Sequence, residues 1–366
     1  MSAQHLLSLT IPLPAIPDFM TIAVRSFAKI NLGLYIGSRR ADGFHDLRTV
    51  YQTIALHDVI RVRVGRGRGI EIVCDDARVP LDSSNTCHRI AERVIKALGA
   101  RKKVTVEIEK RLPVQGGLGA ASSNAVATMV GLERALRKQL GGAERLQIAA
   151  EVGSDLPLFL IGGTVLGIGR GEEVYPLPDF ASTALVVVTP EVGVSTPRAF
   201  AEWDALVEGD AAPARTRKGP SRRDELTPSG ASDKLFEVGR VLSAWLSGNS
   251  NIGLPEAGAP AERKKKSGGR AGSLLSDLVR AGIENDFEKV VFPQLPELRD
   301  IKRALVRAGS KYASVSGSGS TLYGLFDSEK AAVKAARELR KQGLKATATR
   351  TLTRRECRKW SLLATR

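Results

Sequence analysis

The segment 113–126, PVQGGLGAASSNAV, combines residue types that suit the binding of a phosphate group. Its glycines let the backbone approach an anion closely, because no Cβ atom stands in the way. The segment follows an expected strand at 103–110 and precedes a helical pattern that begins near Ala120, so its N–H groups and the helix dipole would face the anion together. Ser122 and Ser123 add hydroxyl groups that can donate to phosphate or ligate magnesium. The same residues also fit a glycine-rich turn in which a serine caps the next helix.

A second candidate group lies upstream, in a segment that reads as strand, turn and strand. Lys29 and Asn31 fall in the first strand and point to the same face, because strand side chains alternate. An Asp-Gly turn at 42–43 then delivers Phe44 and His45 onto the next strand. A lysine and an amide on one face could form a polar pocket, whereas an exposed strand lysine and a structural histidine would need no function.

Asp155 is the carboxylate that would complete a site for phosphoryl transfer. It precedes Leu156 and Pro157, a pattern typical of a helix N-cap aspartate, so capping is the simpler interpretation of this residue alone. Phosphoryl transfer needs a cradle for nucleotide phosphates, a metal ion, a cation near the transferred group and a carboxylate that orients or deprotonates the accepting hydroxyl. The three segments together contain the residue types for each of these tasks.

The elements that must position these residues mix strands and helices without the strict alternation of a doubly wound sheet, which predicts an α+β fold. β-Branched residues with flanking turns predict strands at 21–27, 30–37, 59–65, 103–110, 183–190, 312–317 and 321–326. Apolar residues at helical spacing predict helices at 86–99, 120–140, 144–152, 295–308 and 328–342.

Size and composition are those of a globular protein. The chain has 366 residues, of which 43% are hydrophobic, enough for two cores of ordinary domain size. Its three cysteines show no C-x-x-C spacing, which predicts neither a disulfide framework nor a zinc site. The N-terminus lacks the features of a signal peptide, and no apolar run is long enough to span a bilayer. We therefore expect a cytoplasmic protein with no membrane partner.

The formal net charge of +16 is compatible with a nucleic-acid partner. The densest basic runs, at 215–223, 262–270 and 354–359, carry no interleaved aromatic residues of the kind that stack on single strands. We therefore expect no nucleic-acid partner and interpret the charge as a solvated basic surface, which would also favour a phosphorylated small-molecule substrate.

Composition also divides the chain. Segments rich in glycine, proline, serine and basic residues cannot bury enough apolar surface to offset the entropy of ordering them. We expect a flexible extension at 1–20, a first domain at 21–180, a second domain at 181–350 with a low-complexity basic insert at about 207–273, and a basic tail at 351–366.

Four segments in order resemble the GHMP kinase superfamily. They are AKINLGLYIGSRRADGFHDLRTVYQTIALHD (28–58), PVQGGLGAASSNA (113–125), GSDLPLFLIGGTVLGIGRGEEV (153–174) and SVSGSGSTLYGLF (314–326). Such a resemblance implies a two-domain α+β fold, with a first domain like domain 2 of ribosomal protein S5, a ferredoxin-like second domain and an active site in the cleft between them. The first segment resembles the members that act on a cytidylated methylerythritol rather than on homoserine or mevalonate.

The resemblance further implies ATP-dependent, Mg²⁺-requiring phosphorylation of the 2-hydroxyl of 4-diphosphocytidyl-2-C-methyl-D-erythritol, in the non-mevalonate route to isopentenyl diphosphate. Lys29 would stabilise the transferring phosphoryl group, and Asp155 would act as the base. The substrate side would comprise Asn31, Phe44, His45 and Thr196. The ATP loop would comprise Pro113, Val114, Gln115, Gly116, Gly117, Leu118, Gly119, Ala120, Ala121, Ser122 and Ser123, with Ser122 near the metal ion. A second phosphate loop would comprise Ser316, Gly317, Ser318 and Gly319.

The chain departs from that family's pattern at a few positions. Gln115, Ala120 and Ala121 stand where glycines are usual, so Gln115 must adopt backbone angles open to a non-glycine residue. Phe44 stands where tyrosine is usual and keeps the stacking face without the hydroxyl. Two other interpretations stay open, a homoserine or mevalonate type of kinase and a nucleic-acid-binding protein of related fold. We expect a monomer or a weak homodimer.

Overall fold

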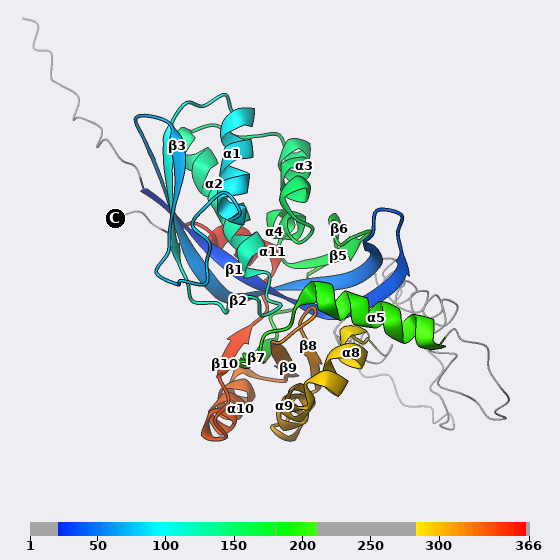
Figure 1. Ribbon diagram of the computed structural model, residues 1–366. Coiled ribbons are helices and arrows are strands. Elements are labelled where there is room, and N and C mark those ends of the chain that lie inside the picture. The colour runs from blue at the N-terminus through cyan, green and yellow to red at the C-terminus, as the bar shows by residue number, and fades with distance from the viewer. Residues whose placement is uncertain (1–20, 180, 211–282, 364–366) are drawn as a thin grey trace, which may run out of the picture.

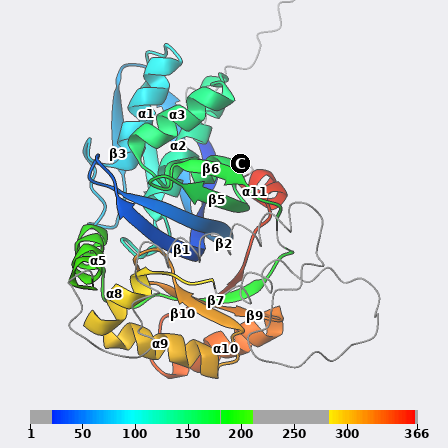
Figure 2. The ribbon, with the colours of Figure 1, turned by 90° about the vertical axis from the view of Figure 1, so that its right-hand side faces the viewer.

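Two sheets lie back to back between two layers of helices (Figure 1). The computed structural model describes residues 21–179, 181–210 and 283–363. From one side of the molecule to the other, the layers are helices α1 to α3, the first sheet, the second sheet, and helices α9 and α10; the turned view in Figure 2 shows the same order.

The first sheet has six strands in the order β3-β4-β2-β5-β6, with β1 paired to β2 off this path. Its core is the long antiparallel hairpin of β1 and β2, whose register shifts between Phe27 and Lys29 and again between Asn31 and Gly33. Such irregularities bend a strand and re-aim its side chains. The strand bounds are β1 (Thr21–Arg39), β2 (His45–Gly65), β3 (Gly69–Val73), β4 (Lys103–Glu109), β5 (Thr164–Ile168) and β6 (Glu173–Pro176).

Four helices accompany the first sheet. Alternating apolar residues of β1, β2 and β4 pack against helices α1 and α2 in one buried cluster that includes Val24, Ile60, Val106 and Met129. The helix bounds are α1 (Thr86–Ala97), α2 (Ala120–Leu136), α3 (Gly142–Val152) and α4 (Leu156–Ile161).

The second sheet has four antiparallel strands in the order β10-β7-β9-β8. One of its faces packs on the first sheet, through residues such as Leu185 and Tyr323 against Ile30 and Ile54, and the other is covered by α9 and α10. The bounds are β7 (Ala184–Val188), α5 (Thr196–Asp210), α8 (Phe287–Gln294), α9 (Pro296–Arg307), β8 (Tyr312–Val315), β9 (Leu322–Phe326), α10 (Glu329–Lys341) and β10 (Ala346–Arg350).

Two segments differ from the sequence-based expectation. The segment expected as a basic tail forms helix α11 (Arg354–Trp360), in which Cys357 is buried. The chain then returns to the first sheet, where Leu362 forms an isolated antiparallel β-bridge with Val24. At the other segment, α5 continues to Asp210, past the expected start of the insert. The rest of the insert up to residue 273, like the extension at 1–20, lies outside the described residues.

No helix in the described ranges is long and apolar enough to cross a membrane.

Candidate active site

Lys29 and Asn31 lie on β1 between the first two of its three register shifts and line a cavity. Both are buried, and the Lys29 Nζ donates to Asn31 Oδ1 at 2.7 Å, so the two side chains do share a face. Asn31 Nδ2 in turn donates to Thr49 Oγ1 at 2.8 Å, and Thr49 donates to the carbonyl of Gly33. This chain of hydrogen bonds fixes the Asn31 amide with its oxygen towards the lysine.

Asp155 faces Lys29 from the other side. Its Oδ2 lies 3.4 Å from Lys29 Nζ, and its side chain is 32% exposed while that of the lysine is 4% exposed. Asp155 occupies the N-cap position of α4, yet its side chain makes no capping hydrogen bond. The structure therefore does not support the simpler interpretation of Asp155 as a helix cap.

Tyr51 orients Asp155, and sequence reasoning missed it. Its hydroxyl donates to Asp155 Oδ1 at 3.0 Å, and burial, with the nearby Asp155 charge, raises the pKa of Tyr51 well above its ordinary value, so the hydroxyl stays protonated. Glycines make room for its ring, because a Cβ at Gly167 would lie 2.5 Å from Tyr51 Cε2 and one at Gly171 would lie 2.5 Å from its oxygen. The sequence signal that could have indicated a large side chain packed here was the group of glycines in the segment 163–171.

The first glycine-rich loop leads into α2 with Gly119 as its N-cap. Gly117 and Gly119 have φ values of 76° and 68°, in the left-handed region that favours glycine. Gln115 also has a positive φ, 58°, an angle that a non-glycine residue adopts in the small left-handed region. The first amides of α2 therefore open towards the loop, an arrangement that suits an anion.

The two serines after the loop differ in position. Ser122 lines both cavities described below. Ser123 is buried and accepts a hydrogen bond from Ser26 Oγ at 2.7 Å. The expectation that both hydroxyls face a phosphate is thus wrong for Ser123, because the helix turns its side chain into the core.

A second loop, 316–320, reaches the first one from the other domain. Ser316 Oγ donates to the carbonyl of Gly117 at 2.9 Å, and the Thr196 and Ser318 hydroxyls are 2.8 Å apart. A Cβ at Gly317 would lie 3.5 Å from Lys29 Nζ. Residues from both domains therefore surround the lysine.

The aromatic end of the cavity is built differently from the expected pair of Phe44 and His45. Phe44 is 51% exposed, and the Arg170 guanidinium lies over its ring. His45 instead is buried, its Nε2 lies 2.6 Å from Asp204 Oδ1, and its ring stacks on Phe200 with centroids 5.0 Å apart. Sequence reasoning missed Phe200 and Asp204, although they follow Thr196 at intervals of four residues and so share one face of α5.

Two adjoining cavities connect these groups. The first, about 640 Å³, is lined by Lys29, Asn31, Phe44, His45, Tyr51, Asp155, Thr196, Phe200, Gly317 and Ser318, among others. The second, about 370 Å³, is lined by every residue from Pro113 to Ser122 and by residues 78–80 and 84–87. Gly117, Gly119 and Ser122 border both, so the first loop separates the two spaces.

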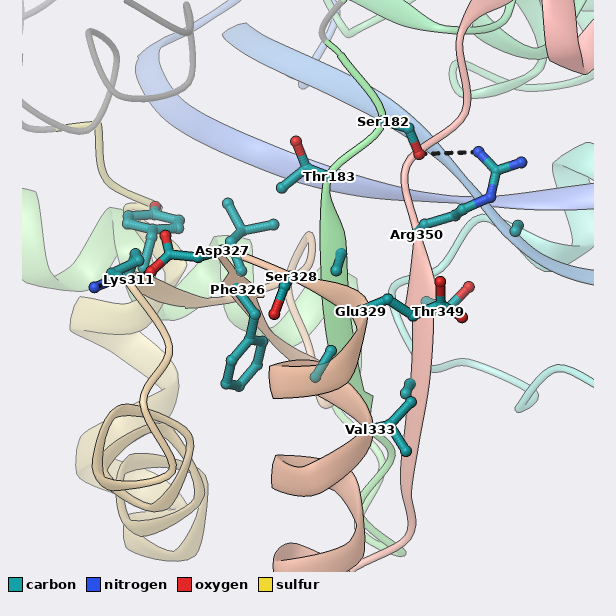
Figure 3. A pocket seen from close by; sticks show the side chains of 16 residues that line it. Ser182, Thr183, Lys311, Phe326, Asp327, Ser328, Glu329, Val333, Thr349 and Arg350 are labelled. Atoms are coloured by element: carbon teal, nitrogen blue, oxygen red, sulfur yellow. Dashed lines mark hydrogen bonds and ion pairs between the residues drawn. The ribbon is translucent and has the colours of Figure 1, made fainter.

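A larger cavity of about 820 Å³ lies elsewhere, at one end of the second sheet (Figure 3). The two basic side chains in its lining each form an ion pair, Lys311 with Asp327 and Arg350 with Glu356. None of the residues expected to act in catalysis lines it. We therefore place the active site in the two smaller cavities.

Comparison with known proteins shows the family of the chain. The chain matches the models of the GHMP kinases N terminal domain over residues 85–163 and of the GHMP kinases C terminal domain over residues 266–345. It is 35% identical over 312 residues, 85% of this chain and 83% of the relative, to 4-diphosphocytidyl-2-C-methyl-D-erythritol kinase of Solibacter usitatus.

Solved structures show the same likeness. A crystal structure of 4-(cytidine 5'-diphospho)-2C-methyl-D-erythritol kinase superposes with a TM-score of 0.63 at 25% identity, covering 90% of this chain and 98% of the other. A homoserine kinase from Cytophaga hutchinsonii superposes with a TM-score of 0.62 at 18% identity, covering 93% and 96%. The second likeness shows the fold alone.

Proposed function

Because the chain belongs to the 4-diphosphocytidyl-2-C-methyl-D-erythritol kinases within the GHMP kinases, we propose that Lys29 and Asp155 carry the reaction of that family. The reaction transfers a phosphoryl group from ATP to the 2-hydroxyl of the cytidylated methylerythritol, in the non-mevalonate route to isopentenyl diphosphate. The observation that carries the proposal is the contact of 3.4 Å between Lys29 Nζ and Asp155 Oδ2 in the lining of the first cavity, where Lys29 packs beside Gly119, a residue that borders both cavities.

Asp155 is the proposed base. It accepts the proton of the 2-hydroxyl while the substrate oxygen bonds to the γ-phosphorus and the bond to the β,γ-bridging oxygen breaks, which releases ADP. The buried Lys29 ammonium stabilises the charge on the transferring group, an effect that is strong where water is excluded. Asn31 keeps that ammonium in place through its fixed amide oxygen.

ATP is proposed to occupy the cavity along 113–122, with its phosphates at the first turn of α2. Among the described residues there is no group of three His, Cys, Asp or Glu side chains that could hold a metal ion alone. Mg²⁺ is proposed to arrive with ATP, because Mg²⁺ keeps water and phosphate oxygens as ligands, and Ser122, which borders both cavities, is the hydroxyl placed to contact it. When bound, the ion neutralises charge on the nucleotide phosphates.

The cytosine ring is proposed to lie at the aromatic end of the first cavity. Phe44 contributes a half-exposed ring to the lining, and the stacked rings of Phe200 and His45 line the same cavity. Thr196, hydrogen-bonded to Ser318, borders the same space. Homoserine and mevalonate carry no aromatic base that could stack on these rings.

All of the residues proposed for the site come from one chain, so a monomer suffices, and we infer a monomer or a weak homodimer.

The test is an ADP-release assay with ATP, Mg²⁺ and 4-diphosphocytidyl-2-C-methyl-D-erythritol, run beside homoserine and mevalonate. Turnover with the cytidylated substrate alone is the expected result, and turnover with either of the others would refute the assignment. Asp155→Asn and Lys29→Met should each abolish turnover while ATP still binds in a direct titration. Near-normal turnover of the Asp155→Asn enzyme would contradict its role as the base.

A further inference from the structure

Arg170 is held in a tight turn on the rim of the first cavity and has donors to spare. It lies between β5 and β6, flanked by Gly169 and Gly171 with φ values of 68° and 99°. The Glu172 carboxylate accepts from the Arg170 backbone N–H at 2.7 Å and from its Nε at 2.9 Å. Within the described part of the chain, the two terminal nitrogens of this guanidinium have no hydrogen-bond partner.

Two contacts locate Arg170 along the cavity. Its guanidinium carbon lies 5.1 Å from the centre of the Phe44 ring, at the aromatic end. The next residue, Gly171, abuts the Tyr51 hydroxyl, which donates to Asp155 at the reacting end. Arg170 therefore stands between the ring that would stack on a base and the carboxylate that would accept the hydroxyl proton.

We propose that Arg170 binds the diphosphate of the substrate, an inference that rests on the proposed function. In a cytidine diphosphate ester of methylerythritol, the diphosphate joins the cytidine to the polyol that carries the reacting hydroxyl. A substrate with its base at Phe44 and its hydroxyl at Asp155 places the diphosphate beside Arg170. The planar fork of a guanidinium donates two parallel hydrogen bonds to phosphate oxygens, which an ammonium cannot do.

The ion pair with Glu172 prepares Arg170 for this task and does not exclude it. The pair uses Nε and fixes the side chain, so less rotational freedom is lost when phosphate binds. Arg39 also lines the cavity, but its side chain is 66% exposed and its nearest carboxylate oxygen, on Asp204, is 4.0 Å away. Arg39 is thus less firmly held than Arg170.

The experiment compares CDP with cytidine, which lacks the diphosphate, by calorimetric titration of the intact enzyme and of Arg170→Gln and Arg170→Lys. The wild type should prefer CDP, and Arg170→Gln should weaken CDP about 10- to 100-fold, the effect of losing a hydrogen bond to a charged group, while cytidine binding is unchanged. Arg170→Lys should fall between them. The KM for the cytidylated substrate should rise in parallel, with the KM for ATP unchanged.

The matched control is Arg303→Gln, which removes the same charge from a partly paired surface arginine on α9. It should bind CDP as the wild type does. Equal weakening of CDP and cytidine by Arg170→Gln would overturn the proposal, because Arg170 would then only support Phe44; so would unchanged CDP binding. These titrations do not need turnover, so a failure of the proposed reaction and a failure of this inference are told apart.

Discussion

Replacing Tyr51 with phenylalanine tests whether a single buried hydroxyl positions the catalytic carboxylate. The ring of phenylalanine fills the same space against Gly167, and only the hydroxyl oxygen beside Gly171 is lost. The change removes one hydrogen bond, from the Tyr51 hydroxyl to Asp155 Oδ1, whose length is 3.0 Å. Asp155 keeps its contact with Lys29 but gains freedom to rotate about its side-chain bonds.

The expected size follows from the chemistry of that bond. A hydrogen bond to a charged group contributes about 1.5–3 kcal/mol. The Asp155 side chain is 32% exposed, so water can replace the lost donor and the lower end of the range applies. About 1.5 kcal/mol at the transition state corresponds to a loss in kcat of about tenfold. The KM values for both substrates should stay the same, because Tyr51 is turned towards Asp155 and not towards a bound ring or phosphate.

The assay is steady-state ADP release together with thermal unfolding. Tyr312→Phe is the control, since the hydroxyl of this partly buried tyrosine lies within hydrogen-bond distance of the carbonyls of Leu32 and Ile283, at 3.1 Å and 3.2 Å. That variant should lower the melting temperature and leave kcat within about twofold of the wild type. The reasoning is refuted if Tyr51→Phe keeps the full kcat, or if it changes only the melting temperature.

Three further outcomes are expected. Gly117→Ala should destabilise the protein by about 1–3 kcal/mol in chemical unfolding, because φ is positive there and the new Cβ would overlap a backbone oxygen of the second loop; Gly142→Ala, which has open space around it, should not. Asp58→Asn should lose about 3–5 kcal/mol in the same measurement, because it breaks the ion pair between the fully buried Asp58 carboxylate and Lys110, whose side chain is only 10% exposed; a neutral result would contradict this. Phe44→Ala should raise the KM for the cytidylated substrate about tenfold without changing that for ATP, and equal increases would argue against base stacking.

Local patterns predicted most of the regular elements. Helices expected at 86–99 and 328–342 are confirmed as α1 and α10, with ends one or two residues away, because each carries an apolar stripe and a clear start or stop. The strands expected at 21–27 and 30–37 are instead one strand, β1. Its irregularities around Lys29 have no sequence signature, because they arise from pairing with β2.

Contacts between distant segments could not be predicted from local patterns. Tyr51 meets Asp155 across 104 positions of sequence, and His45 meets Asp204 across 159. The family resemblance implied that His45 contacts the substrate together with Phe44, and nothing local indicates the carboxylate that binds its ring. Helix α11 is a similar case, because its basic composition conceals one buried face around Cys357.

The first loop needs glycines for packing within the protein as well as for the approach of a phosphate. A Cβ at Gly117 would lie 2.1 Å from the Ser316 carbonyl oxygen of the second loop, and one at Gly119 would lie 2.9 Å from Phe159 Cζ and 3.1 Å from Lys29 Cγ. A side chain at Gly117 would therefore collide with the second domain, and a side chain at Gly119 would collide with Lys29. Since the same backbone separates the two cavities, a side chain added here would move the boundary between the spaces that we propose for ATP and for its acceptor. Loss of activity in such variants thus measures the fit between two domains as well as the affinity for nucleotide.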